Sequence, residues 1–187
     1  MSRDFVARKY IAKQCDNYND NRLKDAVLNA FELMYQNQEP DGCLSTSVAL
    51  YVILRSYGYS PQLCYGLCST PEGNEMYHAW LEVDCKILDL AIYGNSHFSH
   101  YWLDGESVGP FVFEEYADVP MQYSNRVFDD DWENSLLFQA FKMGSMEDYI
   151  DGCPGNGMWN LILRIMGEVL SADRIEELRA YVNKGGY

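Results

Sequence analysis

The sequence predicts a protein of mixed α and β class, in which a central helix is followed by antiparallel strands and then by further helices. A long apolar run begins at Cys43, strand-like stretches follow it, and helical patterns dominate the C-terminal part of the chain. The 187 residues, 48% of them hydrophobic, are enough for one domain with its own core. We therefore expect a single domain over residues 1–187.

The first predicted helix covers residues 22–35, and Asp20 precedes it as a capping residue. Its apolar side chains recur at helical spacing and should face the core: Leu23, Val27, Ala30, Phe31 and Met34. The polar stretch 36–42 then breaks the pattern and predicts a loop that leads to Cys43. We expect one wall of a cleft in this loop.

The apolar run over residues 43–57 is the predicted central helix. Its Val and Ile content also suits a strand, but the run is longer than most strands and ends at Gly58, with Pro61 following, as helices do. Residues 48–54 leave no polar face, so the helix should be covered on most sides. Cys43 would then lie at its N-terminus.

Three strand-like stretches follow, at residues 62–68, 76–83 and 86–92. The last two predict a hairpin that turns at Asp84 and Cys85.

This turn fixes a register, in which Trp80 lies opposite Asp89 and His78 lies opposite Ala91, all on one face of the hairpin. Asp89 becomes the diagonal neighbour of His78, within reach of a hydrogen bond to the imidazole.

Residues 94–130 show no clear period, while residues 131–143, 157–170 and 172–183 predict helices, the last capped by Ser171. We expect a core that carries the site over about residues 20–93 and a helical extension over about residues 131–187.

Cys43, His78 and Asp89 together form a candidate catalytic triad. A thiolate is the nucleophile of a cysteine enzyme, and a helix N-terminus and an imidazolium both favour it. His78 would hold and return the proton, and Asp89 would orient the ring. The backbone N–H of Cys43 is a candidate oxyanion donor, and the candidates for a second donor are Gln36, Gln38 and Trp80.

The residues from Cys43-Leu through Leu54-Arg-Ser-Tyr-Gly58 to His78-Ala-Trp-Leu-Glu-Val-Asp84 and Leu88-Asp89 resemble the transglutaminase-like cysteine proteases of lasso-peptide maturation. The resemblance covers about residues 43–89. It implies a papain-like or transglutaminase-like α+β fold and a Cys-His-Asp triad on Cys43, His78 and Asp89.

The leading functional hypothesis is a thiol-dependent enzyme that hydrolyses an amide bond of a peptide or protein through a thioester on Cys43. One alternative is a transglutaminase or deamidase. Another is a binding or scaffold protein that has this fold without turnover, with the C-terminal helices as its partner surface. We expect no cofactor, and the sequence indicates no oligomeric state.

Composition narrows the range of partners. The formal net charge of −14 would repel nucleic-acid phosphates. Residues 1–10 lack the apolar segment of a signal peptide and no stretch is long enough for a membrane span, so we expect a cytoplasmic protein with reduced cysteines and no membrane association.

The remaining ligand-type residues do not predict a metal site. Cys64, Cys68 and Cys85 lack a usual zinc spacing and are interpreted as apolar fillers. His97 and His100 are interpreted as loop residues, with an alternative role as ligands or as the catalytic histidine. The acidic residues 129–131 are interpreted as a helix cap.

Overall fold

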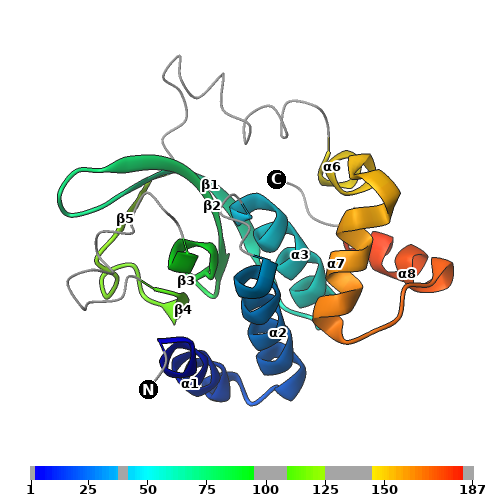
Figure 1. Cartoon of the computed structure of the whole chain (residues 1–187), viewed down its shortest axis with the longest axis horizontal. Helices are drawn as coiled ribbons and strands as arrows, with labels where there is room; N and C mark the ends of the chain where they lie inside the picture. The colour runs from blue at the N-terminus through cyan, green and yellow to red at the C-terminus, as the bar shows by residue number, and fades with distance from the viewer. Residues whose placement is uncertain (1–2, 38–41, 95–108, 125–144, 183–187) are drawn as a thin grey trace.

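The structure is a computed structural model, and it describes residues 3–37, 42–94, 109–124 and 145–182. A curled sheet lies on one side of helix α3, and helices α6, α7 and α8 lie on the other (Figure 1). In chain order the elements are α1 (Arg3–Cys15), η1 (Asp16–Tyr18), α2 (Asn21–Asn37), α3 (Cys43–Ser56), β1 (Gln62–Ser69), β2 (Glu75–Val83), β3 (Lys86–Asp89), η2 (Ala91–Gly94), β4 (Phe111–Glu114), β5 (Gln122–Ser124), α6 (Met146–Gly152), η4 (Pro154–Asn156), α7 (Gly157–Met166) and α8 (Ala172–Val182).

Helix α2 confirms the first predicted helix. The backbone N–H of Arg22 donates to Asp20 Oδ1 at 2.9 Å, so Asp20 caps the helix as expected. The predicted apolar stripe faces the core, with Leu23, Val27, Ala30 and Phe31 buried and Met34 partly buried.

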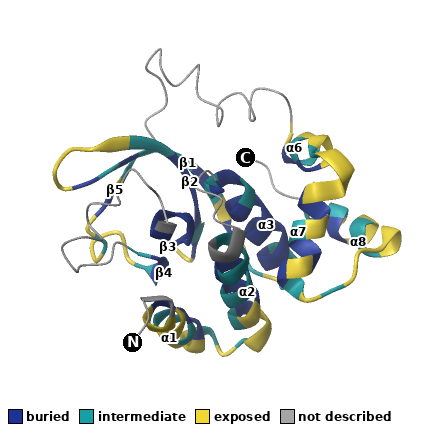
Figure 2. Ribbon diagram, viewed as in Figure 1, coloured by how far each residue is buried: buried dark blue, intermediate teal, exposed yellow. Residues whose placement is uncertain are grey.

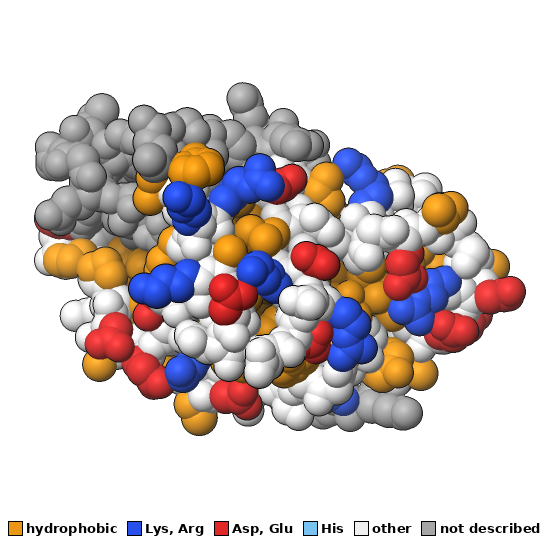
Figure 3. All heavy atoms as spheres, turned by 90° about the horizontal axis from the view of Figure 1, so that it is seen from below, with side chains coloured by type: hydrophobic (Ala, Val, Ile, Leu, Met, Phe, Trp, Pro, Cys, Tyr) orange, Lys and Arg blue, Asp and Glu red, His pale blue; other side chains and the backbone are white. Residues whose placement is uncertain are grey.

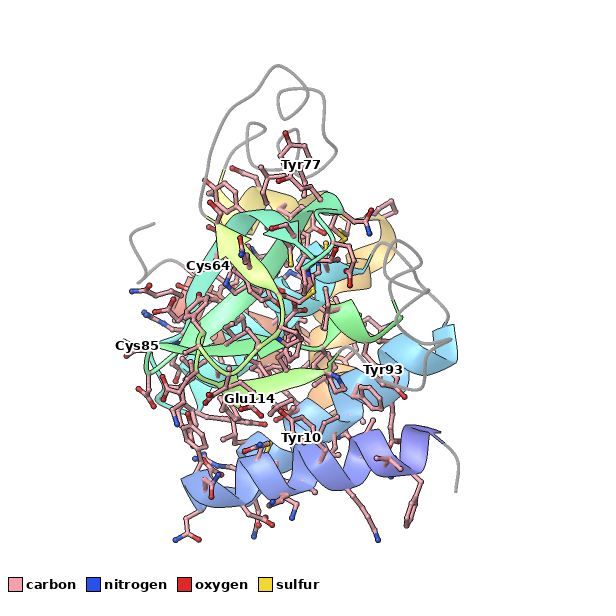
Figure 4. The ribbon with its side chains drawn as sticks, turned by 90° about the vertical axis from the view of Figure 1, so that its left-hand side faces the viewer. Tyr10, Cys64, Tyr77, Cys85, Tyr93 and Glu114 are labelled. Atoms are coloured by element: carbon pink, nitrogen blue, oxygen red, sulfur yellow. The ribbon has the colours of Figure 1, made fainter. Side chains whose placement is uncertain are left out.

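Helix α1 was not predicted, because its apolar stripe is short and interrupted by charge. Among the side chains of α1 that the structure describes, only Ala7, Ile11 and Cys15, each four residues apart, are buried. The hydroxyl of Tyr10 donates to Glu114 of β4, and Gln14 Nε2 donates to the same carboxylate oxygen at 2.8 Å (Figure 4). Helix α1 is thereby held against the edge strand of the sheet.

Helix α3 is the central helix that the sequence predicted, and it is buried along most of its length (Figure 2). It contacts α2, α7, α8 and strands β1 and β2. It ends before Gly58, whose φ of 97° is in the left-handed region that favours glycine. This packing fixes Cys43 at the start of a rigid element.

The five strands among the described residues form one antiparallel sheet in the order β4-β3-β2-β1-β5. The predicted hairpin register is confirmed, because Leu81 lies opposite Leu88 and Val83 opposite Lys86. The turn residues Asp84 and Cys85 have φ of 53° and 62°, the left-handed values that a type I′ turn requires.

The prediction that the third strand continues to residue 92 was wrong. Strand β3 ends at Asp89, and His78 therefore has no ladder partner at Ala91. The reason is local: Asp89 Oδ1 accepts the N–H of Ile92 at 3.2 Å, which turns the chain into the short helix η2.

Side chains of the sheet enter two separate hydrophobic clusters. Ala79, Leu81 and Leu88 point to the larger cluster, which the helices complete. Trp80 and Ile87 alternate with them and point to a smaller cluster on the other face. Strands β4 and β5, which the sequence did not predict, contribute to this smaller cluster.

The C-terminal helices belong to the larger cluster. Helix α7 buries Trp159, Ile162 and Leu163 against α2 and α3. It ends at Met166, earlier than predicted, because Gly167 adopts a left-handed φ of 72°. Helix α8 begins as predicted, with the N–H of Arg174 donating to Ser171 Oγ at 3.3 Å. Helix α6 was not predicted, and the helix predicted at residues 131–143 lies outside the described residues.

On the face of the molecule that Figure 3 shows, Lys and Arg side chains lie among Asp and Glu side chains. One ion pair of the described residues joins Lys24 Nζ to Asp16 Oδ1 at 2.7 Å. Across the described ranges, no helix is both long enough and apolar enough to cross a membrane.

Candidate active site

His78 of β2 and Asp89 at the end of β3 form a buried hydrogen-bonded pair. The ring atom Nε2 lies 2.8 Å from Asp89 Oδ2, and the two residues are 0% and 2% exposed. An ionised carboxylate only accepts hydrogen bonds, so Nε2 carries the proton. The hairpin register brings these two residues together, as the sequence predicted.

Cys43 lies at the start of α3, near enough to His78 for its thiol to interact with the ring. The buried Nδ1 of His78 has no hydrogen-bond partner among the described residues. Burial lowers the pKa of His78, but the charge and hydrogen bond of Asp89 and the interaction with the Cys43 thiol outweigh it and raise this pKa. Because Nε2 is occupied by Asp89, we infer that Nδ1 is the atom that faces the thiol.

The start of α3 has two features that suit an acyl-transfer site. Cys43 is partly exposed, and its backbone N–H is among those that a helix start leaves without an intrahelical acceptor. The helix dipole also favours negative charge at this end. A thiolate and an oxyanion could therefore both be stabilised here.

Asp89 has two further hydrogen-bond donors. Its Oδ2 accepts the hydroxyl of Tyr123 at 2.7 Å, and its Oδ1 accepts the N–H of Ile92 at 3.2 Å. Tyr123 was not predicted as a site residue, because β5 has only three residues and follows a stretch without a clear period. No local signal in the sequence indicates this contact.

Trp80, a candidate oxyanion donor, has its indole N–H already engaged. Nε1 donates to the hydroxyl of Tyr116 at 3.1 Å, and Trp80 is 1% exposed in the smaller cluster. Gln36 lies in the last turn of α2 with its side chain outside the description, and Gln38 lies outside the described residues altogether. A role for either glutamine stays a prediction.

Helix α6 brings Tyr149 near Cys43. Burial raises the pKa of Tyr149 to about 12, and the nearby thiols of Cys153 and Cys43 add to this effect. Tyr149 therefore lies close enough to both Cys43 and Cys153 for electrostatic interaction with each thiol. Neither Tyr149 nor Cys153 was predicted from the sequence as a site residue.

Three of the other cysteines are buried, namely Cys15, Cys64 and Cys68. Burial raises the pKa of Cys15 to about 12 and that of Cys64 to about 11, and it also raises that of Cys68. Cys85 is exposed at the hairpin turn (Figure 4), so its interpretation as an apolar filler was wrong.

His97 and His100, the alternative ligands or catalytic histidine, lie outside the described residues, as does the helix cap interpreted at residues 129–131. Within the part of the chain that is described, no three His, Cys, Asp or Glu side chains gather as metal ligands.

A family model described as the transglutaminase-like superfamily matches residues 4–102. The chain belongs to the transglutaminase-like superfamily. The match spans Cys43, His78 and Asp89, whereas Tyr123 and the C-terminal helices of this transglutaminase-like protein lie beyond it. Comparisons with curated proteins and with solved structures gave no significant match. The resemblance to lasso-peptide proteases stays a prediction.

Proposed function

We propose that this transglutaminase-like protein is a thiol-dependent acyl-transfer enzyme that hydrolyses an amide bond of a peptide or protein. Cys43 is the nucleophile, His78 the general base and acid, and Asp89 the residue that orients the ring. The observation that carries the proposal is the buried ring of His78, which has a carboxylate on Nε2 and lies near enough to the Cys43 thiol, at a helix N-terminus, to interact with it.

In the first step His78 Nδ1 holds the proton of the Cys43 thiol, and the thiolate attacks the carbonyl carbon of the substrate. A C–S bond forms, and the carbonyl oxygen becomes an oxyanion next to the backbone N–H of Cys43. The tetrahedral intermediate then collapses and the C–N bond breaks. The leaving amine takes the proton from Nδ1, which leaves a thioester on Cys43.

In the second step His78 Nδ1 removes a proton from water, and the hydroxide attacks the thioester carbon. The C–S bond breaks, the carboxylic acid leaves, and the thiolate and protonated ring are restored. Asp89 keeps its charge throughout and stabilises the ring each time it is protonated. Its hydrogen bond to Nε2 also leaves Nδ1 as the atom that exchanges protons.

The reaction type can be tested by incubating the full chain with a glutamine-containing protein such as casein and a fluorescent primary amine. Hydrolysis of peptide bonds gives new N-termini, deamidation gives ammonia without new N-termini, and a transglutaminase incorporates the amine. We expect new N-termini that disappear with Cys43→Ala and persist with Cys85→Gly, a control that removes the exposed thiol at the hairpin turn. Amine incorporation as the main product would overturn the hydrolase assignment.

A further inference from the structure

We propose that Tyr123 is a positioning residue of this site. Its hydroxyl shares one oxygen of Asp89 with His78, and it thereby sets how strongly the Asp89 carboxylate attracts the protonated imidazole ring. The catalytic meaning of this inference rests on the proposed function. The contact itself does not.

The hydrogen bonds around Asp89 carry the inference. Oδ2 accepts both the Tyr123 hydroxyl at 2.7 Å and His78 Nε2 at 2.8 Å, while Oδ1 accepts the N–H of Ile92. Asp89 is 2% exposed, so solvent hardly reaches it. Removing the phenol would therefore leave a buried acceptor with one donor fewer.

The position of Tyr123 is set by strand pairing and ring packing. In the ladder between β5 and β1, Tyr123 lies opposite Cys68. Its ring packs on Trp80 with centroids 4.9 Å apart, and on Tyr116 and Phe111 at 6.1 and 6.4 Å. Two strands separate β5 from β3 in the sheet, and the curl seen in Figure 1 lets the hydroxyl reach Asp89 across them.

Sharing an oxygen has a defined electrostatic effect. Each donor offsets part of the carboxylate charge, so the phenol weakens the hold of Asp89 on the protonated ring. A ring held less tightly is a better acid toward a leaving amine. Burial, followed by the charge of Asp89, raises the pKa of Tyr123, so the phenol keeps its proton while it donates.

The test is an NMR titration of His78 in the full chain with Tyr123→Phe, which removes the hydroxyl and keeps the ring. We expect the proton affinity of His78 to rise about three- to tenfold, since one hydrogen bond to a charged group is lost. Tyr116→Phe is the matched control. The hydroxyl of Tyr116 contacts Trp80 and Glu82 instead of Asp89, so the titration should stay at its wild-type position.

A titration of His78 that is unchanged or moves to lower pH in Tyr123→Phe would overturn the inference. If that variant does not fold, 3-fluorotyrosine at position 123 tests the same contact. Its hydroxyl is a stronger hydrogen-bond donor, so the titration of His78 should move to lower pH. An unchanged midpoint would refute the proposal. Selective labelling of Cys43 by iodoacetamide, measured on the wild-type protein, separately decides the proposed function. Either idea can thus fail without the other.

Discussion

Replacing Asp89 with asparagine removes the charge next to His78 and keeps the shape of the side chain. Asparagine can still accept a hydrogen bond through its oxygen, but its neutral amide lacks the negative charge that stabilises a protonated ring. The ring is 0% exposed, so solvent hardly compensates for the lost charge. The variant therefore tests whether the buried pair is charged.

The expected cost follows from these contacts. Removing one partner of a buried ion pair costs about 3–5 kcal/mol if the other charge stays buried. His78 can release its proton and so avoid part of this cost. The part that remains is the loss of hydrogen bonds to a charged group, which contribute about 1.5–3 kcal/mol each. We expect Asp89→Asn to lower the free energy of unfolding by about 2–4 kcal/mol at pH 6.

The pH dependence has a definite sign. The pKa of His78 is raised above its ordinary value of 6.5, against the effect of burial, by Asp89 and Cys43. The stabilisation from the charged ring is thus fully present below pH 6.5 and is lost as the pH rises through the raised pKa. The difference between wild type and Asp89→Asn should shrink between pH 6 and pH 9.

Urea denaturation at these two pH values measures the difference. Asp84→Asn serves as the control, because Asp84 is exposed at the turn of the same hairpin. An Asp89→Asn protein as stable as wild type at pH 6, or a difference of equal size at pH 9, would refute the reasoning.

Three further changes test the fold, each by urea denaturation. Asp20→Ala removes the cap of α2 and should lower the free energy of unfolding by about 1 kcal/mol at pH 7. The hydrogen bond from Arg22 lowers the pKa of Asp20, so this difference from wild type should disappear as the pH drops below 3.8. Cys85→Gly relieves a left-handed φ and should stabilise the protein by about 0.5–1 kcal/mol; a loss of stability would contradict the turn geometry. Ile162→Ala, at a fully buried position of α7, should cost about 2–5 kcal/mol, and a change below about 1 kcal/mol would contradict the packing of α7 on the core.

The central helix and the hairpin could be predicted because their signals are local. The apolar run after Cys43 ends at a glycine, and the turn at residues 84–85 fixes which residues pair. The register then places Asp89 beside His78 without any knowledge of the rest of the chain. Most of the candidate site could therefore be predicted from the sequence of residues 43–89.

The parts that could not be predicted depend on contacts between distant segments. Strands β4 and β5 have four and three residues, and they exist as strands through pairing with β3 and β1. The contact between Tyr123 and Asp89 joins residues 34 positions apart. The early end of β3 depends on the side chain of Asp89 capping η2, which overrides the strand propensity of the residues after it.

The reactivity of Cys43 tests the central claim most directly. Limited alkylation of the wild-type protein with iodoacetamide at pH 6, followed by mass spectrometry of all six cysteines, compares the thiols under one condition. A thiolate paired with a protonated His78 should be alkylated well ahead of the exposed Cys85 and of the four remaining cysteines. Labelling of Cys43 at the rate of Cys85 or more slowly would contradict the account.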